Sequence, residues 1–227
     1  MNSVFGIDVS HYQEGFDWTK AINSPYPEDP QLKFAIIKIS QGTKIIDSKG
    51  KTYATQARTA GLKIGYYHYA QQYTGNQIAL NATAQANHFL YAINSQNLPK
   101  PNFPLILDME NNELRNEYWT KVKANNDLWI NTFIAVLKNN TPSYNVILYG
   151  GKYWFDDYTN NNFGSVPLWH AQYPQKPEQT NPTVANGWVK NGVQNWTIWQ
   201  FSSKGRTFGY TKNLDINVMK KDFFDKA

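Results

Sequence analysis

The chain has 227 residues, none of them cysteine, which excludes a disulfide-stabilised scaffold, a thiol nucleophile and any cysteine-ligated metal. Aromatic residues make up 15% and charged residues only 17%, a balance that excludes a disordered chain. The net charge of +5 gives a weak preference for anionic partners. Basic residues nowhere form a run of five or more, so we expect no nucleic-acid binding.

The chain shows no sign of membrane targeting or of a second domain. No apolar run approaches the ~20 residues that a transmembrane helix needs, so we expect no membrane insertion. Residues 1–13 lack the basic start and long apolar core of a signal peptide. Neither a repeat nor a Gly/Ser linker divides the sequence. We therefore expect one domain over residues 1–227, and we expect it to be a monomer.

Short apolar runs that end in polar residues or glycine recur along the chain and predict strands. Eight such runs occur, at Val4–Val9, Phe34–Ser40, Lys63–Tyr69, Pro104–Glu110, Asn145–Gly150, Pro167–Tyr173, Thr197–Ser202 and Leu214–Val218.

Segments of helical character separate the early strands. Thr52–Leu62 is rich in Ala and Gln, Gln77–Ile93 carries Leu80 and Phe89 at helical spacing, and Tyr118–Lys138 places Trp129 and Phe133 on one face. Alternating strands and helices predict a parallel sheet with helical crossovers. Eight strands in this length favour an α/β barrel of the TIM type over an open doubly wound sheet, which would need a glycine-rich first turn.

The C-terminal third is poor in helices. Pro174, Pro177, Pro182, Gly187 and Gly192 interrupt the segment between the sixth and seventh strands. The segment between the last two strands is equally rich in glycine. We therefore expect about five helices followed by three strands that are joined by loops.

Acidic residues terminate three of the predicted strands, where a parallel barrel carries its catalytic groups. These are Asp8, the pair Asp108 and Glu110, and Asp215. Residues i and i+2 of a strand point to the same side, so both members of the pair would face the barrel mouth. Two carboxylates that close cannot both ionise freely, and one pKa should rise, as a general acid requires. An isolated pair of this kind is typical of a solvated strand end; three acidic strand ends together favour a catalytic site.

Aromatic residues also gather at strand ends. Candidate substrate-binding residues of this group are Tyr67, Tyr149, Trp169, Tyr173 and Gln200, the last of which stands between two aromatic residues. Aromatic rings stack on the apolar faces of sugars, whereas carboxylates and amides bind hydroxyl groups. A carboxylate pair in an aromatic cleft is the usual profile of a glycosidase.

Other chemistries find little support in the sequence. The four histidines form no metal-binding pair, and we expect His68 and His170 to point outward between barrel and helices. The chain contains neither a nucleophile elbow nor a phosphate-binding loop. We therefore expect no metal and no cofactor.

The sequence resembles the glycoside hydrolase family 25 lysozymes, also called Chalaropsis-type muramidases, over its whole length. The matching segments, in the family's order, are 6–13, 65–69, 108–110, 168–173, 199–202 and 214–217. The resemblance implies a (β/α)5β3 barrel, and we expect residues 1–227 to form this catalytic domain with no separate cell-wall-binding module of the kind that members of the family often carry. It also implies cleavage of the β-1,4 bond between N-acetylmuramic acid and N-acetylglucosamine in peptidoglycan, outside the cell or at the cell wall.

The resemblance also implies roles for single residues. Glu110 matches the general acid/base, and Asp108 matches the residue that orients the 2-acetamido group, whose oxygen is thought to attack with retention of configuration. Asp8 and Asp215 match outer acids of the site. Tyr67 and Trp169 match cleft aromatics, and Asn217 is a further candidate of the same motif.

Two alternatives remain open at this point. The first is a related hexosaminidase acting on chitin, although the additional acids that family 18 chitinases carry upstream of this strand are missing. The second is a non-catalytic glycan-binding barrel, which would keep the aromatics but usually lose the acid.

Overall fold

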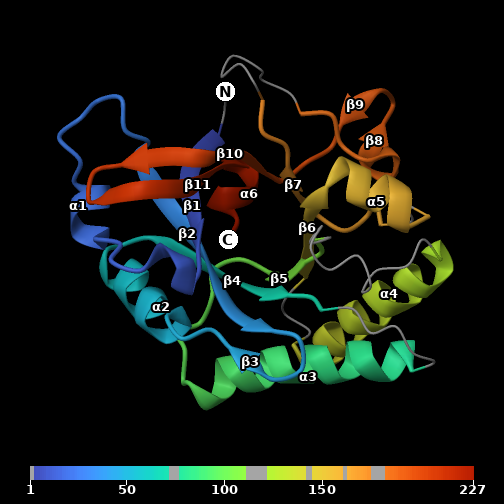
Figure 1. The fold of residues 1–227 in the computed structure, drawn as a ribbon. Helices are drawn as coiled ribbons and strands as arrows, with labels where there is room; N and C mark the ends of the chain where they lie inside the picture. Colours follow the sequence, from blue (N-terminus) through green and yellow to red (C-terminus); the bar gives the residue numbers. More distant parts are fainter. Residues whose placement is uncertain (1–2, 72–76, 111–121, 142–144, 161–162, 175–181) are drawn as a thin grey trace.

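The computed structural model describes residues 3–71, 77–110, 122–141, 145–160, 163–174 and 182–227. Within them, eight strands close into a barrel because β1 pairs with both β2 and β11 (Figure 1). The barrel strands are β1 (Ser3–Val9), β2 (Leu32–Gln41), β4 (Lys63–Tyr69), β5 (Leu105–Asp108), β6 (Val146–Gly151), β7 (Leu168–Ala171), β10 (Ile198–Thr207) and β11 (Tyr210–Lys220). All eight predicted strands are confirmed.

Helices follow each of the first five barrel strands, which confirms the expected (β/α)5β3 order among the described residues. These helices are α1 (Trp18–Ile22), α2 (Gly50–Thr59), α3 (Ile78–Ser95), α4 (Lys123–Asn140) and α5 (Lys152–Tyr158). The predicted start of the fourth helix, at residues 118–121, lies outside the described residues. None of the described helices combines the length and hydropathy that a membrane crossing requires.

The direction of the last strand corrects the sequence prediction. We expected a parallel sheet, but β11 runs antiparallel to both β10 and β1. The physical reason is the short connection: β10 ends at Thr207, β11 begins at Tyr210, and Gly209 between them adopts a φ of 92°. A turn this tight permits only antiparallel pairing, since a parallel pair needs a crossover of a dozen or more residues.

The connections of the C-terminal third carry more structure than expected. The last two strands extend towards each other beyond their predicted bounds, so a tight turn joins them into a long hairpin in place of the expected glycine-rich loop. The segment before β10 contains the 3₁₀ helix η3 (Asn186–Trp188) and a small sheet of β8 (Val189–Lys190) and β9 (Val193–Gln194). The remaining short elements are the 3₁₀ helix η1 (His11–Gln13), β3 (Ile45–Ile46) and α6 (Lys221–Asp225).

One helical face also differs from the prediction. Leu80 on α3 is 65% exposed, whereas Ala82, Ala86 and Phe89 are buried. The small alanine side chains allow the helix to approach the barrel closely, and Gln85 turns inward with them because it bonds to His68. On α4 the predicted face is confirmed, because Trp129 and Phe133 are both buried.

The barrel interior changes character along its axis. The lower part is apolar and is filled by side chains that include Phe34, Phe103, Ile106, Ile147, Ile198 and Met219. At the same level Gly6 and Gly65 leave space for the rings of Phe34 and Phe103, which pack edge to face at 5.9 Å. Above this level the inward-facing residues of the same strands are polar. The lower half of the barrel interior is therefore apolar, and its upper end is polar.

The C-terminal helix closes the lower end of the barrel. Lys63, at the start of β4, donates hydrogen bonds to the carbonyls of Phe224 and Ala227 at 2.7 and 2.8 Å. The ring of Phe224 lies 6.2 Å from that of Phe103 inside the barrel. With this end closed, the interior opens at the opposite end, where the parallel strands terminate.

The space beside Gly6 gives a test of the barrel packing. A Cβ atom at Gly6 would stand 2.5 Å from three atoms of the Phe34 ring, so we expect Gly6→Ala to lower the free energy of unfolding by roughly 1–3 kcal/mol in denaturant titrations. Gly151→Ala is the matched control, because its Cβ would meet its nearest atom at 3.7 Å and its φ is −82°. Equal stabilities for the two variants would contradict the packing.

Candidate active site

A cleft of about 300 Å³ occupies the open mouth of the barrel. Nine of the ten predicted site residues line it: Asp8, Tyr67, Asp108, Glu110, Tyr149, Trp169, Tyr173, Gln200 and Asp215. The tenth, Asn217, is fully buried and lies beneath the cleft, where it contacts Asp8 and Trp169. The structure therefore brings the predicted residues together, with Asn217 supporting the cleft floor rather than facing it.

Asp8 is held by two amide side chains. Oδ2 of Asp8 accepts hydrogen bonds from Nδ2 of Asn217 at 2.7 Å and from Nε2 of Gln200 at 2.8 Å. Both donors come from the C-terminal hairpin, one from β11 and one from β10. Because the two bonds converge on one oxygen, they fix the carboxylate plane of Asp8 against the barrel wall.

Aromatic donors orient those amides in turn. The indole Nε1 of Trp169 donates to Oδ1 of Asn217 at 2.7 Å, while the hydroxyls of Tyr149 and Tyr173 donate to Oε1 of Gln200 at 2.8 and 2.6 Å. Each amide therefore receives hydrogen bonds at its oxygen and donates from its nitrogen, which leaves one orientation for both. Trp169 and Tyr149 are 1% and 6% exposed, so they form the floor of the cleft.

Asp108 and Glu110 form the carboxyl pair predicted from the sequence. Asp108 ends β5 and is 3% exposed, while Glu110 follows the strand and faces the cleft. The two side chains are close enough for each to shift the pKa of the other. Met109 between them is fully buried on the other side, towards the helices. Oδ1 of Asp108 is buried and has no hydrogen-bond partner among the described residues.

Burial and mutual repulsion hold protons on this pair. Burial, followed by the charge of Glu110, raises the pKa of Asp108 well above its usual range. Desolvation in the cleft and then the charge of Asp8 raise the pKa of Glu110, whereas its interaction with Asp108 opposes that shift. The same interaction raises the pKa of Asp108. For a proton shared by the pair, these opposite effects favour the position on Asp108, the more deeply buried member.

The two outer acids face each other across the antiparallel pair of β1 and β11. Asp8 is in direct register with Asp215, so both side chains lie on the same side of the sheet. Burial raises the pKa of Asp8 to about 6, against the opposing effect of its amide hydrogen bonds. Burial, together with the charges of Asp8 and Glu110, raises the pKa of Asp215 to about 8. We call Asp8, Asp108, Glu110 and Asp215 the acid cluster.

Several residues of the cleft were not predicted as site residues. They are Ser10, Tyr12, Gln13, Lys38 and Tyr69. Lys38 had a signal in the sequence, since it is the one charge within the apolar run Phe34–Ser40 and shares the alternation of Phe34 and Ile36. Tyr12 and Gln13 lie in a segment that follows β1, and local polarity there gives no indication of a cleft wall.

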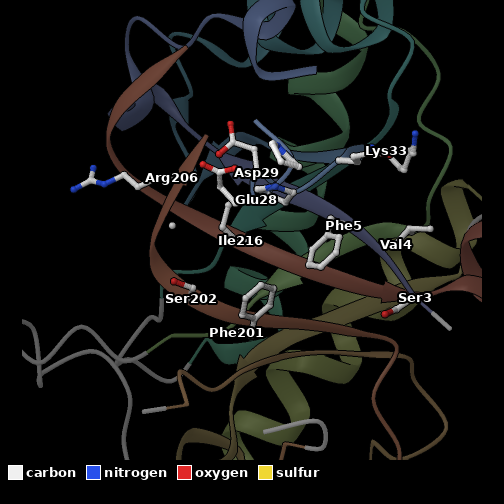
Figure 2. Close-up of a pocket in the computed structure, with 14 residues that line it drawn as sticks. Ser3, Val4, Phe5, Glu28, Asp29, Lys33, Phe201, Ser202, Arg206 and Ile216 are labelled. Atoms are coloured by element: carbon white, nitrogen blue, oxygen red, sulfur yellow. The ribbon is translucent and has the colours of Figure 1, made fainter. Parts of the chain in front are cut away.

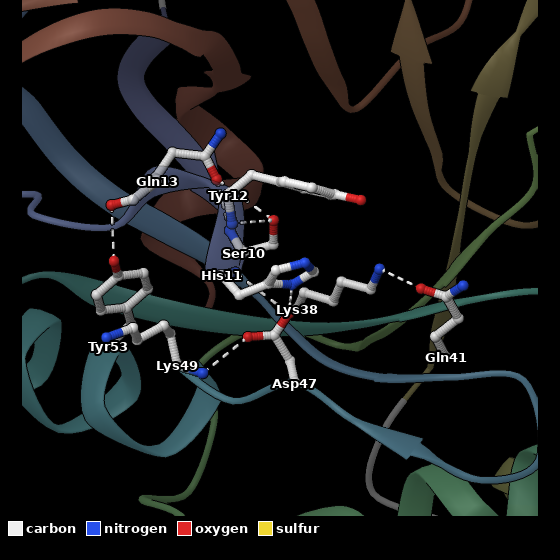
Figure 3. A network of polar contacts seen from close by, with 9 residues as sticks. All are labelled: Ser10, His11, Tyr12, Gln13, Lys38, Gln41, Asp47, Lys49 and Tyr53. Carbon is white, nitrogen blue, oxygen red and sulfur yellow. Dashed lines mark hydrogen bonds and ion pairs between the residues drawn. The ribbon is translucent and has the colours of Figure 1, made fainter.

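A hydrogen-bonded network fixes the segment after β1 that carries Tyr12 (Figure 3). Ser10 and Gln13 form a capping box around η1, and the hydroxyl of Tyr53 on α2 donates to the carbonyl of Gln13 at 2.7 Å. Nδ1 of His11 lies 2.7 Å from Oδ2 of Asp47, and its ring packs against that of Tyr12 in a tilted arrangement with centroids 4.1 Å apart. The ring of Tyr12 remains 73% exposed at the edge of the cleft, where it is free to meet a ligand.

A second cavity, of about 660 Å³, lies on the outside of the barrel (Figure 2). It is bounded by β1, the β10–β11 hairpin and the segment before β2, and its apolar floor contains Phe5, Phe201 and Ile216. None of the predicted site residues lines it. The acid cluster belongs to the smaller cleft.

The histidines take structural positions, as predicted for His68 and His170. Both are fully buried on the outer side of the barrel, and His68 packs 5.3 Å from the ring of Phe133 on α4. Burial lowers the pKa of His68 to about 3, so this residue remains neutral. The described part of the chain contains no group of three or more acids and histidines arranged to hold a metal ion.

Comparisons with known proteins agree with this geometry. The sequence pattern of the family described as Glycosyl hydrolases family 25 matches residues 7–210. Lysozyme M1 of Streptomyces globisporus is 29% identical over 219 residues, covering 95% of this chain and 67% of that protein. The N,O-diacetylmuramidase of Arthroderma benhamiae is 27% identical over 201 residues, covering 87% and 76% respectively.

A solved structure gives the same result for the fold. The bacterial lysozyme from Streptomyces coelicolor superposes with a TM-score of 0.74 at 28% identity, covering 95% of this chain and 91% of that one. The match of the family pattern spans most of the barrel, including Asp8, Asp108 and Glu110. The chain therefore belongs to glycosyl hydrolases family 25, and its enzyme class is that of the lysozymes and muramidases.

Proposed function

We propose that this enzyme cleaves the β-1,4 bond between N-acetylmuramic acid and N-acetylglucosamine in peptidoglycan, with Glu110 as general acid and base. The observation that carries the proposal is the Asp108–Glu110 pair in the cleft, together with the buried Asp108 Oδ1 that lacks a partner among the described residues. A buried carboxyl oxygen without a partner is costly unless a ligand satisfies it. An acetamido N–H of the substrate supplies that missing donor.

The pair then performs acid catalysis in a defined order. When the acetamido N–H donates to Oδ1, the ionised form of Asp108 becomes favourable and the shared proton passes to Glu110. Glu110 gives this proton to the glycosidic oxygen as the bond from that oxygen to the anomeric carbon breaks. The carbonyl oxygen of the acetamido group bonds to the anomeric carbon on the opposite side, and Asp108 stabilises the positive charge on nitrogen.

Water completes the reaction. The ionised Glu110 takes a proton from a water molecule, which attacks the anomeric carbon and releases the acetamido oxygen. Two inversions at this carbon give net retention of configuration. The outer acids are poor nucleophiles for the alternative covalent route. Asp215, with a pKa raised to about 8, keeps its proton at neutral pH, and one oxygen of Asp8 is occupied by two amides.

The cleft also suits an extended sugar chain. Tyr12 and Tyr173 are 73% and 51% exposed at the cleft, so their rings are available to stack on sugars. We infer that Tyr67, Tyr149 and Trp169 shape the floor and that Asp8, Asp215, Gln200 and Asn217 hold or support the polar groups of the substrate. Residues 1–227 would act as one catalytic domain, as a monomer, at the cell wall or outside the cell where peptidoglycan lies.

Replacing the proposed acid tests this assignment. We expect Glu110→Gln to lower the release of reducing ends from purified peptidoglycan by ~10²–10⁴-fold, since the amide cannot donate the proton. Glu14→Gln is the matched control, because Glu14 is exposed and forms an ion pair with Lys49 outside the cleft. Mass spectrometry of the products fixes the bond, and soluble chitin oligomers serve as the competing substrate. Near-wild-type rates for Glu110→Gln would refute the assignment.

The charge of Asp8 should be visible in the pH profile. This charge raises the pKa of Glu110, so its removal should lower that pKa. We expect Asp8→Asn to move the alkaline limb of kcat/KM to lower pH, whatever its effect on the maximum rate. The control is Asp222→Asn on α6, at the closed end of the barrel, which should leave the limb in place. A limb that stays fixed in Asp8→Asn would show that the two acids are not coupled.

The acetamido group provides a test of the mechanism itself. Chemically de-N-acetylated peptidoglycan lacks the proposed internal nucleophile, so we expect it to be cleaved at least roughly a hundredfold more slowly. Re-acetylation of the same material should restore the rate and controls for damage to the glycan. Proton NMR of the fresh product should show the β-anomer. Equal rates on acetylated and deacetylated material would exclude participation of the substrate.

A further inference from the structure

Lys38 is a buried cation inside the mouth of the barrel. It lies on β2 with its side chain on the inward face, and it is 5% exposed. Lysine is rarely buried to this degree unless a charge of opposite sign compensates it. Among the described residues that line the cleft, Lys38 is the one cation beside four carboxyl groups.

The contacts of Lys38 hold its ammonium group in place without neutralising it. Nζ donates a hydrogen bond to Oε1 of Gln41 at 2.6 Å and lies 4.8 Å from the centre of the Tyr69 ring (Figure 3 shows the first contact). Both partners are uncharged. Among the described residues, no carboxylate lies within ion-pair distance of Nζ, so its charge acts on the acids through space.

The strand is distorted at this position. The register between β2 and β4 shifts between Lys38 and Ser40, which marks a bulge directly after the lysine. Bulges next to active sites redirect a side chain that regular pleating would aim elsewhere. The bulge and the hydrogen bond to Gln41 are two separate features of the backbone and side chains that set the position of the ammonium group.

The charged and titratable groups around Lys38 come from every neighbouring strand. Asp8 lies on β1, Tyr67 and Tyr69 lie on β4, and Asp108 and Glu110 lie at the end of β5. Asp47 interacts with Lys38 from the segment after β3, and His68 does so from the outer side of β4. Helices α2 and α3 pack against the opposite face of β2, so the sheet separates their charged groups from the ammonium group of Lys38.

We propose that Lys38 is a positioning residue for the Asp108–Glu110 pair: its fixed positive charge lets the pair keep one negative charge, and therefore a single transferable proton, in a cleft of four acids. The inference rests on the proposed role of Glu110 as general acid. Burial lowers the pKa of Lys38, while the charges of Asp108, Asp47 and Glu110 oppose that shift. In the reverse direction, the lysine charge lowers the pKa of both Asp108 and Glu110.

The sign of the effect is opposite to that of removing an acid. Without Lys38 the ionised forms of both acids lose their counter-charge, so both pKa values should rise. The pair would then hold its second proton to higher pH, and Glu110 would lose its ability to act as base in the second half of the reaction. The alkaline and acid limbs of the pH profile should both move to higher pH.

The experiment compares pH profiles of kcat/KM for reducing-end release from purified peptidoglycan. Lys38→Met and Lys38→Gln remove the charge at similar length, and we expect both limbs to rise by about one pH unit. Lys38→Arg keeps the charge and should retain the wild-type limbs. The matched control is Lys33→Met, which removes an exposed lysine from the same strand and should change neither limb.

Circular dichroism and thermal melting identify which neutral variant is folded, and one folded neutral variant is sufficient. Wild-type limbs in that variant would overturn the proposal, and so would an arginine variant whose limbs move as far as those of the neutral variant. Full activity of Glu110→Gln would instead refute the general-acid assignment itself. The two failures are therefore distinguishable.

Discussion

The closed barrel forces carboxyl groups of like charge into one desolvated space. Asp8 and Asp215 stand in direct register on neighbouring antiparallel strands, and Asp108 and Glu110 line the same cleft at the end of β5. Like charges placed opposite each other destabilise a sheet when both are ionised. The cleft tolerates the arrangement because burial raises the pKa of each acid and keeps protons on the cluster. Crowding and burial of the acids therefore have two effects: they make the ionised cluster costly in the folded state, and they keep protons available for catalysis.

The antiparallel hairpin is the second element on which the site depends. Its turn at Gly209 brings β11 back beside β1, and this return places Asp215 and Asn217 next to Asp8. The hairpin also contributes Gln200, so both amides that hold Asp8 come from it. An eighth strand linked by a helical crossover would run parallel to β10 and would not set Asp215 in antiparallel register with Asp8.

The sequence predicted the barrel and most of the site because both depend on alternation. Apolar runs located the eight barrel strands, and period-two alternation placed Tyr67, Asp108 and Trp169 on the inward side, where the structure has them. Two other features depend on contacts between distant segments. The position of Leu80 was predicted wrongly, and the supporting role of Asn217 was not predicted. The exposed position of Leu80 follows from the close approach of α3, and the supporting role of Asn217 follows from its bonds to Asp8 and Trp169. Lys38 was not predicted as a site residue: the alternation of β2 places it on the inward side, but only the contacts with the other strands show which acids it stands beside.

The central claim is that the acid cluster retains protons at neutral pH in the free enzyme. Infrared difference spectroscopy of the wild type against Glu110→Gln, in the carboxyl stretching region, measures this directly without substrate. The account predicts a protonated-carboxyl band at pH 7 that changes in the variant, because the shared proton loses its acceptor. Spectra in which all four acids are fully ionised at pH 7 would contradict it.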